Sequence, residues 1–245
     1  MGLNSFILSL TFIFLALLRL SNGQDRVITF SRSKKEWIID CSGLFIQGVI
    51  IPATPFILVP LLKLILPNLS GRYEIHTLFQ FIISFVIIDY LYYWNHRIFH
   101  SRKLWHIHRL HHSSVHLDII STSRNSFFAS FLFIYLWFQT MVMFLFHDDS
   151  GFMLGLLFTY CLDLWRHSGL RTPNFIKPFI SWFLLLPEEH LLHHSLQGRS
   201  KNFGANLSWW DKIHGTYSNR VIENKILNPK THQNVLKELF YPERT

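Results

Sequence analysis

The chain has 245 residues, of which 49% are hydrophobic and only 16% charged, with 24 Phe and 8 Trp. The apolar residues collect in blocks, which is typical of a membrane protein and excludes an ordinary soluble domain. The net charge of +8 does not indicate a nucleic-acid-binding protein, because the basic residues alternate with apolar blocks and form no single stripe. Cys41 and Cys161 lie at or inside apolar segments without CxxC spacing, so they support neither a disulfide framework nor a thiolate zinc site.

The first predicted element is the apolar run at 5–18. No lysine or arginine precedes it and it has no clear cleavage site, so a short membrane helix is favoured over a signal peptide core. Residues 42–67 follow, interrupted by three prolines, and then residues 77–95, whose one formal charge is Asp89. Both segments approach the roughly 20 residues that a bilayer core requires. They are the second and third predicted spans.

The fourth and fifth predicted spans are residues 127–146 and 151–165. The acidic turn "HDDSG" joins them, which predicts a helical hairpin. The whole pattern predicts an all-α integral membrane helical bundle of about four to five spans. We expect residues 1–76 to form N-terminal membrane spans, 77–217 a second domain, and 218–245 a polar C-terminal tail.

The charges between the spans predict the orientation of the bundle. The segments 24–40, 96–125 and 166–201 are basic, whereas the predicted hairpin turn is acidic. The positive-inside rule therefore places all three basic segments in the cytoplasm. As a consequence, both histidine-rich regions are expected to face the cytoplasm from the same side of the membrane.

The histidines themselves are spaced for metal binding. "HRIFH" places two imidazoles four residues apart on one helical face, and "HRLHH" and "HLLHH" each give the spacing i, i+3, i+4. At this histidine content, about 0.05 copies of HxxHH are expected by chance, and the chain has two. A further histidine directly follows the fifth predicted span. These nine residues, in chain order, are His96, His100, His108, His111, His112, His167, His190, His193 and His194.

Nine imidazoles exceed the four ligands of one tetrahedral zinc, so two metals fit the count, with Zn, Cu, Fe and Ni left open by ligand type. A hydrolytic two-metal site would usually include carboxylates, and the nearest, Glu188 and Glu189, are expected to start a helix after Pro187. A metal transporter would place its ligands at mid-membrane. The other alternative is a non-catalytic membrane protein in which structural zinc ties the cytosolic helices together.

Five motifs carry a family resemblance, in order along roughly half of the chain. They are "DYLYYWNHRIFH" (89–100), "LWHIHRLHHSS" (104–114), "RHSGLRTP" (166–173), "PEEHLLHHS" (187–195) and "NFGANLSWWDKIHGTY" (202–217). With these motifs the chain resembles the fatty acid hydroxylase and sterol desaturase superfamily of integral membrane oxygenases. The version "HSGLRTP" is more similar to the bacterial sterol-desaturase-like branch.

The resemblance implies a bundle of membrane helices capped by a cytosolic histidine-rich helical domain, with residues 77–217 as the fatty acid hydroxylase/sterol desaturase-like catalytic domain. It implies an O2-dependent oxidoreductase of lipid biosynthesis or modification, which hydroxylates or desaturates unactivated C–H bonds of lipids taken from the bilayer, with hydroxylation favoured here. The electrons would come from a separate donor protein, cytochrome b5-like or ferredoxin-like. The residues carried over as ligands of a non-haem di-iron centre, with O2 as co-substrate, are His96, His100, His108, His111, His112, His167, His190, His193 and His194.

Three aspartates are expected either to support the predicted histidine ligands or to stabilise helix ends. Asp89 and Asp163, seven and four residues before a predicted ligand, either accept a hydrogen bond from a ligand's second nitrogen or are helix-end charges. Asp211 either steadies a histidine box or caps a helix, with capping slightly favoured. The histidines predicted not to bind metal are His106, His116, His147, His214 and His232.

Overall fold

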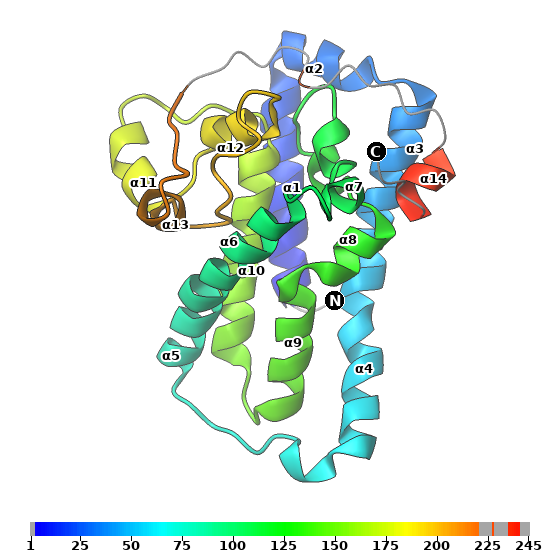
Figure 1. The fold of residues 1–245 in the computed structure, drawn as a ribbon, viewed down its shortest axis with the longest axis vertical. Helices are drawn as coiled ribbons and strands as arrows, with labels where there is room; N and C mark the ends of the chain where they lie inside the picture. The colour runs from blue at the N-terminus through cyan, green and yellow to red at the C-terminus, as the bar shows by residue number, and fades with distance from the viewer. Residues whose placement is uncertain (1–2, 221–226, 228–234, 241–245) are drawn as a thin grey trace.

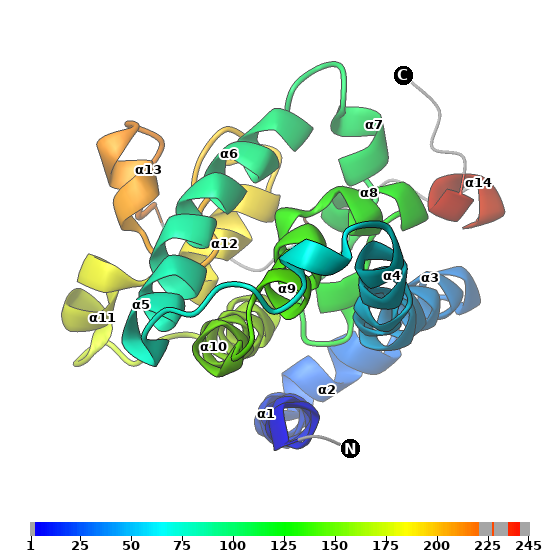
Figure 2. The same ribbon diagram turned by 90° about the horizontal axis from the view of Figure 1, so that it is seen from below.

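The computed structural model describes residues 3–220, 227 and 235–240 and is helical throughout, with two isolated β-bridges and no strand in that part of the chain. Figure 1 shows the long axis of the molecule vertical, with α4, α5, α9 and the lower half of α10 extending to one end. The short helices α2, α7, α11, α12 and α13 gather towards the other end. Seen along the bundle in Figure 2, α1, α4, α9 and α10 are nearly end-on, whereas α5 and α6 are tilted.

The N-terminal run forms one helix, α1 (Leu3–Ser21), which packs against α10 (Ser150–His167). Asn22 then caps α2 (Gly23–Phe30) by accepting a hydrogen bond from the backbone N–H of Gln24. Most of the large apolar side chains of α1 are exposed, including Phe14 and Leu17. A helix with exposed apolar side chains along its length is suited to contact with lipid.

The second predicted span is part of a continuous 32-residue helical segment, Lys34–Ile65. It comprises α3 (Lys34–Phe45), the π-helix η1 (Ile46–Ile50) and α4 (Ile51–Ile65). Ser33 and Glu36 form a capping box at its start. The π-turn lies immediately before Pro52 in the first turn of α4, and Pro55 and Pro60 lie inside α4. Proline lacks a backbone N–H and crowds the preceding turn, so irregular helical geometry next to these prolines is expected.

The third predicted span also contains a π-turn. It consists of α5 (Thr77–Ile82), η3 (Ile83–Ile87) and α6 (Ile88–Phe99), which together form a 23-residue helix. Two short segments at opposite ends of the molecule connect this helix to its neighbours. The connection from α4, which includes the 3-10 helix η2 (Pro67–Leu69), pairs at Tyr73 with Phe146, whereas the connection after α6 leads to the histidine-rich region.

The fourth predicted span does not form one helix. It divides at Phe133 into α8 (Phe127–Leu132) and α9 (Ile134–Leu145), because Phe133 adopts an extended backbone. Asn95 of α6 stabilises the break by donating to the carbonyl of Leu132 and accepting from the N–H of Ile134. The 12 residues of α9 extend about 18 Å at about 1.5 Å per residue, well short of a hydrocarbon core of about 30 Å.

The fifth predicted span is α10, and the short turn between α9 and α10 confirms the predicted hairpin. Three helices in the described part of the chain are long and apolar enough to cross a membrane, namely Leu3–Ser21, Lys34–Ile65 and Thr77–Phe99. The all-helical membrane fold is therefore supported, with three candidate spans in place of the predicted four to five.

The remaining elements lie at the histidine-rich end. They are α7 (Trp105–His108), the 3-10 helices η4 (His111–Ser113) and η5 (Ser121–Ser123), α11 (Lys177–Phe183), α12 (Pro187–His194), α13 (Trp209–Ile213) and α14 (Val235–Phe240). Helix α14, the only helix described beyond residue 220, packs against α3 and α8 and pairs Glu238 with Arg109. Both histidine-rich regions thus lie at the same end of the bundle, as predicted.

Candidate metal centre

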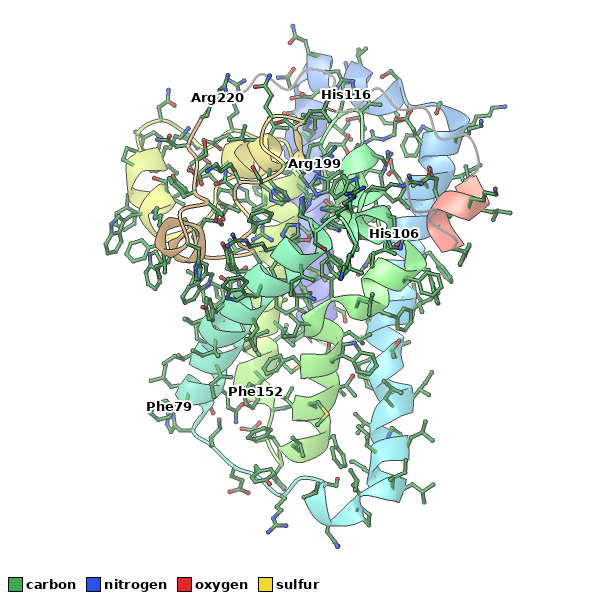
Figure 3. The ribbon with its side chains drawn as sticks, viewed as in Figure 1. Phe79, His106, His116, Phe152, Arg199 and Arg220 are labelled. Carbon is green, nitrogen blue, oxygen red and sulfur yellow. The ribbon has the colours of Figure 1, made fainter. Side chains whose placement is uncertain are left out.

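The candidate ligands come from five separate segments that converge at one end of the bundle. His96 lies in the last turn of α6 and His100 is its C-cap, His108 ends α7, and His167 ends α10. The others come from η4 and α12. Eight of the nine side chains are less than a tenth exposed, and His100 is half-buried. Figure 3 shows side-chain nitrogen atoms concentrated between the labelled Arg199 and His106, above the apolar part of the bundle.

The buried imidazoles form two groups of four, and within each group one nitrogen of every ring lies within 4.8 Å of the others. Each histidine group combines four residues from three segments. The first histidine group is His96, His100, His112 and His193, and the second histidine group is His111, His167, His190 and His194.

His108 is adjacent to the first histidine group. Its Nε2 atom lies 3.1 Å from Nε2 of His96 and 3.2 Å from Nε2 of His112. The expectation that "HRLHH" forms one helical face is wrong, because α7 ends at His108 and the Ser113 hydroxyl bonds back to the carbonyl of Leu110 in a tighter 3-10 turn. His111 therefore turns to the second histidine group while His112 turns to the first.

In the first histidine group, backbone carbonyls orient two of the rings. Nδ1 of His96 donates to the carbonyl of Phe203 (2.9 Å), and Nδ1 of His193 donates to the carbonyl of Lys201 (2.6 Å). A carbonyl can only accept, so the hydrogen of each ring is on Nδ1 and Nε2 carries a lone pair. The Nε2 atoms of these two rings lie 3.2 Å apart.

The second histidine group repeats this arrangement. Nδ1 of His111 donates to the carbonyl of Arg124 (3.2 Å) and Nδ1 of His167 to the carbonyl of Asp163 (2.9 Å), leaving their Nε2 atoms 3.3 Å apart. Burial favours the neutral rings, since it lowers the pKa of His111 and of His193 to about 3. Burial likewise lowers the pKa of His108, His112, His190 and His194 well below the usual value.

The arrangement fits a bound cation in each histidine group. Two neutral imidazoles that face one another with lone pairs repel, whereas a metal ion between them would accept both lone pairs. Metal-binding histidines typically donate their other ring N–H to a carbonyl or carboxylate, as four of these rings do. No carboxylate belongs to either histidine group, so the donor set is imidazole, which suits Zn, Cu, Fe and Ni.

The aspartates have different roles from one another. Asp89 accepts hydrogen bonds from the N–H groups of Asn206 and Leu207 and from the indole of Trp210, so of its two expected roles the bond to a ligand is wrong. Its buried carboxylate satisfies backbone donors of the loop that follows Phe203. Asp163 does contact a candidate ligand, with Oδ1 3.3 Å from Nδ1 of His167.

Asp211 steadies the first histidine group through the backbone. Its carboxylate accepts from the N–H groups of Phe203 and Gly204, both at 2.8 Å, and the carbonyl of Phe203 holds His96. The slightly favoured capping role is wrong, because the N-cap of α13 is Ser208. The predicted helix start at Pro187 is confirmed, and Glu189 accepts from the N–H of Leu186 there.

The histidines predicted not to be ligands lie outside both histidine groups where they are described. His147 is exposed in the α9–α10 turn, and His214 stacks on Tyr90 and Tyr93. His106 and His116 are half-buried, and neither belongs to a group. His232 lies outside the described residues. Cys41 is exposed and Cys161 half-buried, and both are free thiols.

Sequence reasoning missed the carbonyls that hold the rings, because any residue can supply a carbonyl and only the fold decides which one does. It also missed Trp105, whose ring centroid lies 5.2 Å from those of both His100 and His112. The guanidinium carbon of Arg199 lies 4.2 Å from the centroid of Trp105 on the outer side of the site. A tryptophan directly before the histidine box was the available signal.

Fold and site together define a helical membrane protein with two buried histidine groups suited to metal ions. The family model described as "Fatty acid hydroxylase" matches residues 81–216, more than half of the chain. The chain belongs to the fatty acid hydroxylase family, whose members carry out metal-dependent hydroxylation.

Curated relatives agree with this membership. The chain is 29% identical to alkylglycerol monooxygenase of Xenopus tropicalis over 156 residues, which cover 61% of this chain and 32% of that protein. It is 32% identical to ornithine lipid hydroxylase OlsE of Rhizobium tropici over 151 residues (58% and 42%). It is 28% identical to fatty acid hydroxylase vlmA of Lecanicillium sp over 171 residues (64% and 47%).

The aligned segments span about a third to a half of these relatives. No solved structure gives a significant match to the chain.

Proposed function

We propose that the protein is a membrane-bound non-haem di-iron oxidoreductase that uses O2 to hydroxylate a C–H bond of a lipid. The observation that carries the proposal is the pair of buried histidine groups, each with two Nε2 lone pairs opposed at 3.2 or 3.3 Å. The three relatives named above are lipid hydroxylases or monooxygenases by name. The names of these relatives favour hydroxylation over desaturation as the reaction of this protein.

The proposed ligands divide unequally between the two irons. His108 joins the first histidine group as a fifth ligand, since its Nε2 is within 3.2 Å of two members. The second iron has four. The ligands of the first iron are then His96, His100, His108, His112 and His193, and those of the second are His111, His167, His190 and His194.

When bound, the two irons supply the O2 activation that breaking an unactivated C–H bond requires. The protein's own residues perform the remaining tasks. Hydrogen bonds from Nδ1 to backbone carbonyls fix the orientation of four rings, His96, His111, His167 and His193, and keep their Nε2 atoms available. The near-complete burial of the rings keeps bulk water away from the reacting atoms, and the apolar helices below them are placed to admit a lipid chain from the bilayer.

We assign electron delivery to a separate donor protein, cytochrome b5-like or ferredoxin-like, with an acidic surface. Residues 96–117 and 190–210, which include all members of the first histidine group, contain six Arg or Lys residues and no Asp or Glu. Arg102 and Lys103 are exposed, and Arg199 lies over Trp105, which contacts two rings of the first histidine group. A basic surface in contact with the site suits an acidic partner. In this assignment the basic end faces the cytoplasm.

The decisive experiment measures oxygen incorporation. Membranes that contain the protein, or purified protein in lipid nanodiscs with iron and a reductant, are supplied with 18O2, and the lipids are profiled by mass spectrometry. We expect a lipid species that gains one labelled oxygen and that is absent with His111→Ala or His193→Ala, both inserted normally in the membrane.

Two results would contradict the proposal. Full activity of a metal-free preparation would remove the metal from the mechanism. A protein that binds two zinc ions, melts at a lower temperature without them and consumes no oxygen with any lipid would instead support a structural zinc protein.

A further inference from the structure

The second histidine group is connected to helices that precede the family domain. His111 donates to the backbone carbonyl of Arg124, and the Arg124 side chain is fully buried against α3, where its Nε donates to Oδ1 of Asp40 at 2.6 Å. Asp40 is itself fully buried and lies 41 residues before the family domain begins at residue 81. The fully buried salt bridge between Asp40 and Arg124 thus links α3 to the candidate ligand His111, because the backbone carbonyl of Arg124 accepts the hydrogen bond of His111.

The salt bridge belongs to a larger buried network. Arg32 donates from Nε to Oδ2 of Asp40 at 2.9 Å and from its terminal nitrogen to Asp118. The two guanidinium groups and two carboxylates balance in charge, so each ion is compensated without solvent. Removing one partner of such a buried network is costly, because it leaves an uncompensated charge.

The backbone approach between α3 and the loop before Arg124 is also unusually close. A Cβ at Gly43 would lie 2.2 Å from the carbonyl oxygen of Ser123, so only glycine permits this packing. Gly43 is one turn after Asp40 on α3. The helix therefore holds both the backbone and the side chain of the segment that positions His111.

Helix α1 makes a second connection, on the other side of the same histidine group. The buried Arg19 donates to the carbonyl of Gly169 at 2.7 Å, two residues after His167, and pairs with Asp25 of α2 at 2.9 Å. Gly169 has a positive φ of 71°, and a Cβ there would lie 2.2 Å from the Arg19 guanidinium. The segment that ends α10 is thus fitted around a side chain of α1.

In the first histidine group, the hydrogen bonds described for two of the rings have a different origin. His96 and His193 donate to carbonyls of Phe203 and Lys201, and Asp211 holds the peptide of Phe203. All of these supports lie within the family domain, residues 81–216. The two histidine groups are therefore supported by different parts of the chain.

We propose that α1–α3 are a dedicated support for the second histidine group, in which Asp40, Arg32 and Arg19 are positioning residues that set the metal affinity of that group alone. This inference rests on the proposed function, because it requires both histidine groups to bind metal. It means that the family domain by itself holds one ordered metal site, and that the N-terminal helices complete the other.

The test isolates each site before perturbing its support. His193→Ala disables the first histidine group and leaves the second, whereas His167→Ala does the reverse. Asp40→Asn is then added to each background in the full-length protein in nanodiscs, and Fe2+ binding is measured anaerobically as metal content at buffered free Fe2+. With His193→Ala we expect Asp40→Asn to weaken binding by about 10- to 100-fold, the usual effect of losing an outer support. With His167→Ala we expect Asp40→Asn to change the Fe2+ affinity by less than about 3-fold, since the remaining site does not depend on this support.

Matched variants complete the design. Asp211→Asn should give the reciprocal pattern and weaken only the first histidine group, while Glu36→Gln, a half-buried carboxylate in the first turn of the same helix α3, should alter neither. Normal binding by Asp40→Asn with His167→Ala also demonstrates a folded protein. If Asp40→Asn does not fold, Arg32→Lys replaces it. This variant keeps the positive charge but cannot bond to Asp40 and Asp118 at the same time, as the guanidinium group does.

Equal weakening in both backgrounds, or none in either, would overturn the inference. Native protein that binds no metal at all would instead contradict the proposed function, so the two failures are distinguishable.

Discussion

The imidazole rings of His112 and His194 stack with centroids 4.4 Å apart and planes at 24°, although they belong to different histidine groups. Each has a sequence neighbour in the opposite group, His111 beside His112 and His193 beside His194. The two HxxHH boxes therefore each contribute to both histidine groups, and this shared origin holds the two groups side by side.

This sharing predicts which metal each substitution removes. His111→Ala and His112→Ala should each lower the metal content from about two ions per chain to about one, in line with a two-metal site, while the double variant should bind almost none. Metal analysis of purified protein measures the content, and each single variant should lose oxygenation completely. His106→Ala, five residues earlier and outside both histidine groups, is the control. Loss of both metals from each single variant would contradict separate groups.

Much of the fold and the candidate residues could be predicted from sequence because they depend on local patterns. The apolar runs at 5–18, 42–67 and 77–95 correspond to the three candidate spans, and the charge pattern placed the histidine-rich segments at one end. The break at Phe133 was not predictable, because it depends on Asn95, a side chain 38 residues away that bonds to the backbone on both sides of it.

The division of the histidines into two groups could not be predicted from the sequence either. A helical face predicts that His108, His111 and His112 act together, and the turn after α7 instead sends His111 away from the other two. Asp89 shows the same limit, since its position seven residues before His96 suggested a contact with a ligand. Its actual partners are 117 or more residues away in sequence and were visible only in the folded chain.

The buried neutral histidines predict acid sensitivity. Their pKa values are lowered in the folded protein, to about 3 for His111 and His193, whereas the unfolded chain titrates at about 6.5. Stability is therefore fully present above pH 6.5 and is lost as the pH falls below it, by up to about 1.4 kcal/mol per pH unit for each such histidine.

Thermal unfolding of the purified protein in detergent at pH 7.5, 6.5 and 5.5 measures this effect. We expect a small change between the first two values and a steep fall in melting temperature between the last two. His147→Gln, at an exposed position, should leave the profile unchanged. A melting temperature that is constant down to pH 5.5 would show that these rings are not held neutral.

The orientation of the bundle predicts opposite labelling of its two ends. In a Cys41→Ser, Cys161→Ser background, a single cysteine replaces either Asp148 of the α9–α10 turn or Arg102 after α6, both exposed. A membrane-impermeant maleimide should label Asp148→Cys in intact cells and Arg102→Cys only after permeabilisation. Labelling of Arg102→Cys alone in intact cells would reverse the proposed orientation.

The basic surface beside the first histidine group predicts how an acidic donor is affected by charge reversal. Arg199→Glu should slow reduction of the metal centre by an acidic donor protein about 10-fold or more at low ionic strength, because rim charges act mainly on association. Reduction by dithionite and the metal content should change far less, since Arg199 packs on Trp105 and acts on the candidate ligands His100 and His193 only through its charge. Stopped-flow absorbance of the donor measures the rate, and the difference between the variant and the native protein should shrink at high salt as the charges are screened.

The matched control is Arg72→Glu, at an exposed position in the loop at the opposite end of the bundle. Equal rates for Arg199→Glu and Arg72→Glu at every salt concentration would mean that electrons enter elsewhere.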